Sequence, residues 1–79
     1  MPDPDPKPMR ILNAHDLGQA IRRRRKALGL TQEDVAAQVG IARITVGAIE
    51  NGKETAHIGL VLQVCRDLGL PLMTEGPQG

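Results

Sequence analysis

The chain has 79 residues, 41% hydrophobic and none aromatic, and its ten Lys/Arg against nine Asp/Glu give a formal net charge of +1. A chain this short forms one small domain, which excludes a two-domain enzyme with an interdomain cleft. Without aromatic residues, base stacking on aromatic platforms is excluded, and a charge near zero gives no global argument for nucleic acid.

The N-terminal segment, residues 1–12, begins with alternating prolines at positions 2, 4, 6 and 8. Proline lacks a backbone donor and biases its predecessor toward extended geometry, so we expect a disordered tail. Docking of this tail to a partner is the alternative. It differs from a signal peptide, and no apolar run reaches the ~20 residues of a membrane span. A single cysteine, Cys65, allows no internal disulfide and suits the cytoplasm.

Four helical segments follow, so we expect an all-α domain over residues 13–69. Asn13 and Thr31 are good N-cap residues, and Asp34 stands at the capping-box position after Thr31. Glycines follow each helix and end it. The helices are expected at 13–28, 31–39, 42–50 and 56–68. Residues 70–79 complete the chain as a short strand over 70–74, which Pro71 confines to an edge, and a tail.

The second and third helices are joined only by Gly40-Ile41. Two short helices with so brief a connection cross at a large angle, as in a helix-turn-helix. The apolar spacing agrees, because Val35, Ala36 and Val39 face inward from one helix. Val46 and Ile49 anchor the other helix, and Ile41 fills the turn.

This run, from Gln32 to Asn51 (QEDVAAQVGIARITVGAIEN), resembles the helix-turn-helix of the Cro/C1-type (XRE) repressor family. The flanking Leu28–Gln32 and Glu50–Lys53 match the same pattern, and the resemblance covers residues 13–69. It implies a lambda-repressor-like bundle of four main helices that binds double-stranded DNA, with a palindromic operator, as a transcriptional repressor. No cofactor, metal or small-molecule substrate is implied.

Residues 53–73 (KETAHIGLVLQVCRDLGLPLM) are similar to the end of the small HipB-type antitoxins. That resemblance implies a C-terminal strand that pairs with its copy across a dimer, although Pro71 is a poor residue for such a strand. It also implies a kinase-type, HipA-like toxin as partner and autoregulation of the toxin-antitoxin operon. A stand-alone phage-type or controller regulator without a toxin is the alternative.

Five consecutive cations, Arg22 to Lys26, lie on the first helix. Leu17, Ile21 and Leu28 mark its buried side, and Arg24 and Arg25 lie close to it. An unpaired buried charge is costly, so Arg25 needs a carboxylate, and Glu50 is the candidate. In the family an Arg and a Glu at these positions pair, which leads us to expect an Arg25–Glu50 ion pair.

The three outer cations, Arg22, Arg23 and Lys26, point away from the core. A solvated helix face is the simplest interpretation, and attraction to phosphates or to an acidic partner is the alternative. Segmenting the charge favours nucleic acid: residues 22–53 hold seven Lys/Arg and three Asp/Glu, hence +4, which leaves −3 for the remainder. The near-neutral total therefore conceals a positive helix-turn-helix.

The third helix should enter the major groove. The side opposite its buried residues carries the candidate base-reading residues Arg43, Ile44, Gly47 and Ala48. Arg43 stands near the helix start and can bond guanine, and Ile44 can contact a thymine methyl. Gly47 either lets the backbone approach the groove closely or is merely tolerated.

Phosphate contacts are expected around this helix. Gln32 begins a helix whose N-terminus favours a phosphate, and the family uses this Gln on the backbone. The candidate phosphate-contacting residues are Thr31, Gln32, Thr45, Asn51 and Lys53. Ala42 replaces the Ser/Thr usual at the cap of the third helix, which removes one capping contact.

The fourth helix carries an apolar stripe of Ile58, Val61, Leu62, Cys65 and Leu68, which Leu60 and Val64 widen to roughly 200°. A monomer needs nearer 100°, so the excess predicts a C2 homodimer. The expected interface residues are Leu60, Val64, Leu70, Leu72 and Met73.

The sequence thus predicts a cytoplasmic, dimeric, DNA-binding antitoxin and repressor, associated with the nucleoid when bound. A protein-interaction module that has lost DNA binding is a second class. Its support is that Ile44, Gly47 and Ala48 have no side-chain hydrogen-bonding groups with which to recognise bases. An enzyme is the third class and is not expected, because no cluster of catalytic or metal-ligating residues joins His15 and His57.

Overall fold

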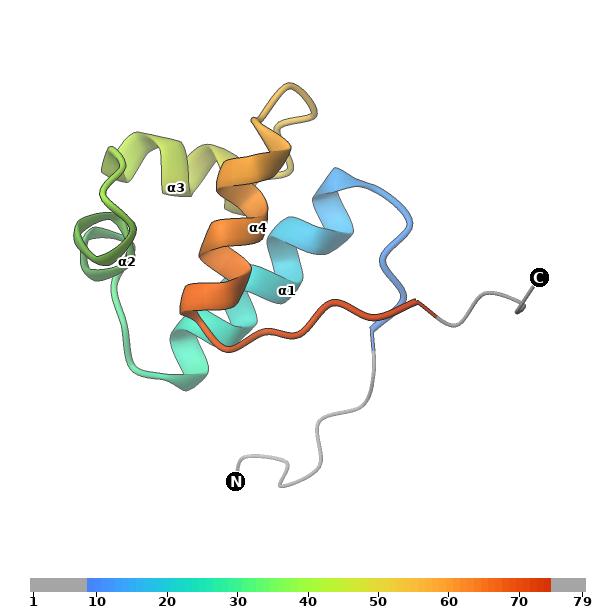
Figure 1. The fold of residues 1–79 in the computed structure, drawn as a ribbon, viewed down its shortest axis with the longest axis horizontal. Helices are drawn as coiled ribbons and strands as arrows, with labels where there is room; N and C mark the ends of the chain where they lie inside the picture. Colours follow the sequence, from blue (N-terminus) through green and yellow to red (C-terminus); the bar gives the residue numbers. More distant parts are fainter. Residues whose placement is uncertain (1–8, 75–79) are drawn as a thin grey trace.

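The computed structural model describes residues 9–74 and contains four helices: α1 (Ala14–Ala27), α2 (Gln32–Val39), α3 (Arg43–Glu50) and α4 (Ile58–Asp67) (Figure 1). The predicted all-α class is confirmed, and each helix starts within two residues of its expected position. Within residues 9–74 no strand is present, and 70–74 run on from α4 without secondary structure. The predictions for residues 1–8 and 75–79 concern chain outside the described residues.

Side chains and glycines set the helix ends. The Asn13 side chain accepts a hydrogen bond from the Asp16 amide at 2.8 Å. Thr31 and Asp34 form a reciprocal capping box, in which each side chain accepts from the other's backbone amide, at 3.0 and 2.8 Å. These bonds satisfy amides that a helix N-terminus would leave unpaired. Ala42 makes no side-chain cap at α3, as expected.

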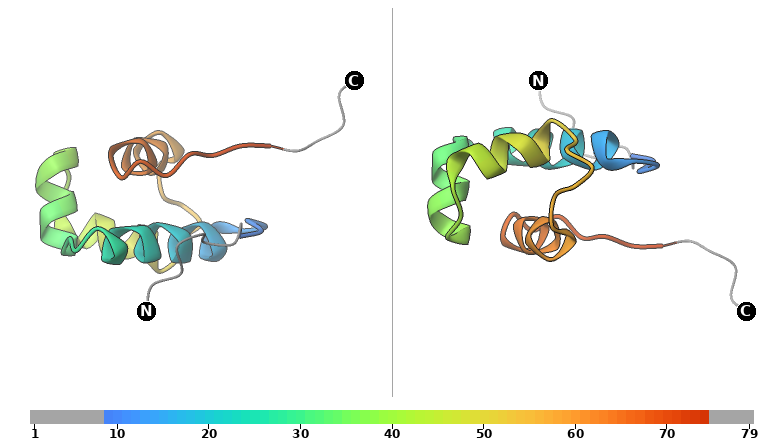
Figure 2. Two further views of the ribbon diagram at one scale, coloured as in Figure 1. Left: turned by 90° about the horizontal axis from the view of Figure 1, so that it is seen from below. Right: turned by 90° about the horizontal axis from the view of Figure 1, so that it is seen from above.

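The helices form two layers. Figure 2 shows α1 and α3 in one layer, α4 opposite them, and α2 closing one end. The aliphatic core lies between the layers and includes Ile21, Val35, Val46 and Leu68, all almost fully buried. None of the helices in residues 9–74 is long and apolar enough to cross a membrane.

The contact between α1 and α3 depends on the absence of a side chain at Gly18. A Cβ at Gly18 would lie 2.4 Å from the carbonyl oxygen of Ile49 and 2.5 Å from that of Glu50. Such a contact is far inside van der Waals distance, and a backbone carbonyl cannot swing aside. Gly52 makes a similar approach, since its Cβ would lie 2.6 Å from the Cα of His15. The start of α1 is therefore tightly packed against the end of α3.

One expectation for α4 is wrong. Val64, predicted to contact a second subunit, is completely buried in this chain, and it packs with Val61, Cys65 and Leu68. Ile58 and Leu62, expected on the buried stripe, are instead 66% and 37% exposed. Val64 therefore belongs to the core cluster of this chain, together with residues such as Ile21 of α1 and Val35 of α2.

Candidate nucleic-acid interface

The turn between α2 and α3 has the geometry of a helix-turn-helix. Gly40 adopts a left-handed conformation with φ 85°, which residues other than glycine adopt only at a cost. The amides of Gly40 and Ile41 both donate to the carbonyl of Ala36, at 2.8 and 3.0 Å. Ala36 is 5% exposed, and its small side chain allows α3 to cross close to α2. Three residues therefore connect the two helices, and α3 lies across α2 (Figure 1).

A buried ion pair joins α1 to the end of α3. Arg25 Nε donates to Glu50 Oε2 at 2.6 Å, and Arg25 Nη2 donates to Glu50 Oε1 at 3.0 Å. The third guanidinium nitrogen, Nη1, donates to the carbonyl of Leu30 at 2.8 Å. The hydrogen bonds with Glu50 raise the pKa of Arg25 above its ordinary value. The Arg25–Glu50 pair expected from the sequence is present in the structure.

Gln32 extends this network to the start of α2. Its Nε2 donates to Glu50 Oε1 at 3.1 Å, so Glu50 receives bonds from α1 and from α2 while it belongs to α3. Across residues 9–74 no buried side-chain polar atom lacks a hydrogen-bond partner. A fully bonded buried network of this kind fixes the relative positions of the helices that contribute to it.

The free side of α3 carries the four candidate base-reading residues. Arg43 is exposed, Ile44 is 79% exposed, and Gly47 and Ala48 are partly exposed. Arg43 Nε lies 3.9 Å from Glu33 Oε1, and both side chains are exposed, so this pair constrains the guanidinium little. A Cβ at Gly47 would make an ordinary 3.6 Å contact with Gln32 Oε1, so packing within the chain does not require glycine there.

The candidate phosphate-contacting residues border this face of α3. Asn51 and Lys53 are exposed just after α3, and Thr45 is partly exposed on it. Thr31 and Gln32 stand at the start of α2, where Thr31 caps the helix and Gln32 already bonds Glu50. Whether these five residues touch phosphates stays a prediction.

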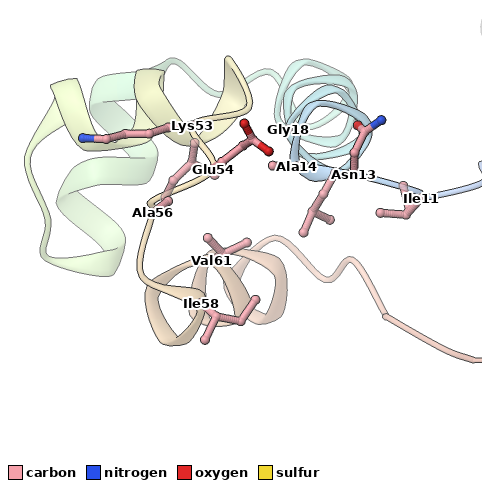
Figure 3. Close-up of a pocket in the computed structure, with 11 residues that line it drawn as sticks. Ile11, Asn13, Ala14, Gly18, Lys53, Glu54, Ala56, Ile58 and Val61 are labelled. Carbon is pink, nitrogen blue, oxygen red and sulfur yellow. The ribbon is translucent and has the colours of Figure 1, made fainter.

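The sequence also singled out His15, His57 and Cys65 as chemical groups. His15 and His57 are exposed, and Cys65 is buried, which raises the pKa of its thiol. Among residues 9–74 no group of three His, Cys, Asp or Glu side chains could hold a metal ion. A pocket of about 340 Å³ lies between the start of α1 and the start of α4 (Figure 3), and aliphatic side chains such as Ile11, Ile58 and Val61 contribute much of its lining.

Two contacts that matter for the interface were missed from the sequence. One is the Gly18 approach, whose only signal was a glycine in the middle of a good helix pattern. The other concerns Arg24, which was placed close to the buried side of the first helix but was assigned no partner. Its Nε donates to the carbonyl of Leu68 at 2.8 Å, so it caps the end of α4. A cation near a helix C-terminus is favourable, so an arginine on the first helix could have been considered as a partner for the C-terminal carbonyls of the fourth.

The two-layer bundle and the free face of α3 define a helix-turn-helix DNA-binding protein. A family model described as Helix-turn-helix matches residues 21–73, and the chain belongs to this family, of the Cro/C1 (XRE) type. The HTH-type transcriptional regulator y4mF of Sinorhizobium fredii (strain NBRC 101917 / NGR234) is 40% identical over 68 residues, which cover 86% of this chain and 90% of that protein. The chain is therefore a helix-turn-helix transcriptional regulator.

Two solved structures share the fold. A HipB-O4 20mer complex matches with TM-score 0.77 and 22% identity over 87% of this chain and 97% of that one. A HipA-HipB-O2-O3 complex matches with the same TM-score and identity, and with the same two coverages. At this identity the likeness concerns the fold alone, and it extends over nearly the whole of the described chain.

Proposed function

We propose that this protein is a sequence-specific repressor that binds a palindromic operator as a homodimer. The observation that carries the proposal is α3 itself. Arg43 stands exposed at its N-terminal end, and the Arg25–Glu50 pair holds its C-terminal end against α1. Recognition helices contact bases through their N-terminal residues, and a bidentate Arg–guanine bond is the commonest specific contact. A rigidly held helix with a free guanidinium at its leading end suits that role.

The homodimer is supported by apolar residues that the single chain leaves uncovered. These are Ile58 and Leu62 on α4 and, beyond it, Leu72 and Met73, which are 46% and 86% exposed. Leu60 and Leu70 are partly exposed and complete the proposed interface. This set of residues differs from the one expected from the sequence in that it omits the buried Val64. A second copy would cover this surface and would place two α3 helices in successive major grooves, about one helical turn apart. Sedimentation as a stable monomer at micromolar concentration would contradict the homodimer.

The finer proposal is that the protein is a HipB-like antitoxin, cytoplasmic and nucleoid-associated, that binds a kinase-type, HipA-like toxin. Its support is the fold that this chain shares with HipB over 87% of its length. One of the matched HipB structures is a complex with HipA. The experiment is co-expression with the neighbouring reading frame, followed by affinity purification of this chain. A kinase-fold protein that copurifies, and whose growth inhibition this chain relieves, would support the antitoxin.

A stand-alone regulator is the second candidate. The observation that favours it is the y4mF relative, named only as a transcriptional regulator although 40% identical. If the neighbouring frames encode no kinase-fold protein and the chain still represses its own promoter, this second candidate replaces the antitoxin.

A further inference from the structure

One row of residues along α1 faces the end of α3. His15, Gly18, Arg22 and Arg25 follow one another at spacings of three, four and three, which keeps them on the same edge of a helix. Three of the four contact the end of α3 or the loop after it. Gly18 abuts the carbonyls of Ile49 and Glu50, Arg25 bonds Glu50, and the backbone of His15 lies against Gly52. Arg22 lies between Gly18 and Arg25 in this row.

Unlike Gly18 and Arg25, Arg22 is exposed. No ion pair within residues 9–74 involves it, because the pairs there join Arg25 to Glu50 and Arg43 to Glu33. The layer formed by α1 and α3 lies on one side of the molecule and α4 lies on the other (Figure 2). Arg24 marks the side of α1 that faces α4, since it bonds the carbonyl of Leu68. Arg22 is turned about 160° from Arg24 around the helix, so it lies on the outer side of this layer.

Arg23 provides a natural comparison. It is the next residue in the chain, has the same side chain and is also exposed. At about 100° per residue, however, it is turned away from the row that faces α3. The two arginines therefore carry the same charge, but Arg22 lies on the side of α1 next to α3 and Arg23 does not.

We propose that Arg22 contacts a DNA phosphate beside the groove that α3 enters, and that Arg23 does not. The proposal rests on the DNA binding assigned above and adds α1 to the elements that hold the duplex. A phosphate contact from this edge would fix the distance between the backbone and α3, which is how such contacts set register. In the proposed homodimer, the positive charge of each Arg22 then acts at one site in its own half of the duplex.

The test is the salt dependence of duplex binding by the full chain. Two probes are used: a duplex selected by the wild-type protein from a random pool, and an unselected random-sequence duplex of equal length. For Arg22→Ala, the slope of log K against log salt should become shallower by about 0.9 per protomer, hence by about 1.8 for the proposed homodimer, on both probes. Between about 50 and 200 mM salt, the wild-type dimer would therefore lose about 12-fold more affinity than the variant. Arg22→Lys should keep the wild-type slope, and so should Arg23→Ala.

Three outcomes would overturn the proposal. An unchanged slope for Arg22→Ala with a lower melting temperature would mean that Arg22 serves only the carbonyl end of α3. An unchanged slope with weaker binding to an acidic protein partner would assign Arg22 to that partner. Equal slope changes for Arg22→Ala and Arg23→Ala would show a diffuse charge effect. If no sequence is selected from the pool, the proposal of a palindromic operator is contradicted. The slope measured on the random duplex then tests the role of Arg22 separately.

Discussion

Arg25 and Glu50 form a two-bonded, buried ion pair that links the first helix to the last residue of the third. Gln32 adds a bond from the second helix to the same carboxylate, so three helices meet at one side chain. This junction lies at the opposite end of α3 from Arg43. The proposed recognition helix, α3, is therefore fixed at its C-terminal end, whereas Arg43 at its N-terminal end is exposed, and several predictions rest on that asymmetry.

Removing the carboxylate should destabilise the fold. Glu50→Ala leaves the Arg25 guanidinium buried and without its counter-charge, which typically costs about 3–5 kcal/mol. Chemical denaturation measures the free energy of unfolding. The matched control is Glu33→Ala, which removes a carboxylate from an exposed pair at 3.9 Å and should change stability by less than about 1 kcal/mol. Equal effects of the two substitutions would show that burial of the Glu50 pair contributes nothing.

The absence of a side chain at Gly18 should be essential to the packing of α1 on α3. Overpacking a core typically costs about 1–3 kcal/mol, and Gly18→Ala should lie at the upper end because its Cβ would meet backbone carbonyls. Gly59→Ala is the control, since a Cβ there meets nothing within 4 Å, and alanine favours a helix by up to about 1 kcal/mol. Thermal melts of both variants should shift in opposite directions; a Gly18→Ala protein as stable as wild type would refute this account of the contact.

Base choice should depend on Arg43. Arg43→Ala is expected to cost about 1–3 kcal/mol of binding to the selected duplex and to relax preference at one base pair, because a bidentate contact to guanine is lost. Lys53→Ala should weaken binding to selected and random duplexes by the same factor, as a phosphate contact would. Competition binding against single-base variants of the duplex measures both. If Arg43→Ala reduces affinity for all sequences equally, Arg43 does not read a base.

Self-association should depend on the exposed apolar residues of α4. Leu62→Glu places a charge on the proposed interface and should shift the protein from dimer to monomer, with a large loss of operator affinity because the two half-sites no longer bind together. Leu28→Glu changes a side chain of similar exposure, 44%, at the end of α1 and should leave the dimer intact. Analytical ultracentrifugation distinguishes the two, and a dimeric Leu62→Glu protein would place the interface elsewhere.

The capping box of α2 predicts a pH dependence. Hydrogen bonds from Thr31 lower the pKa of Asp34 below its ordinary value. A carboxyl with a lowered folded-state pKa stabilises the protein above its unfolded pKa of about 3.9 and loses that contribution as pH falls through the folded value. Asp34→Asn should thus be less stable than wild type at pH 7, and the difference should shrink below about pH 4. Denaturation at the two pH values measures it, and a constant difference would mean that the ionised carboxylate is not what stabilises the cap.

The helix boundaries were predictable because local chemistry sets them: Asn13 and Thr31 cap two starts, and glycines end all four helices. The Arg25–Glu50 pair was predictable because a buried arginine needs a carboxylate and the family resemblance indicated Glu50. The buried face of α4 was not predictable, since a wide apolar stripe does not reveal which half of it the other helices cover. Val64 was therefore assigned to the wrong half. Gly18 was missed because a close backbone approach leaves no periodic pattern.

The most direct test of the account is the binding of the wild-type chain to a palindromic duplex selected from a random pool, compared with a scrambled duplex of the same composition. At physiological salt we predict a preference of about 10³-fold or more, with half-sites about one helical turn apart and affinity that falls as salt rises. Equal affinity for the selected and scrambled duplexes would contradict sequence-specific repression.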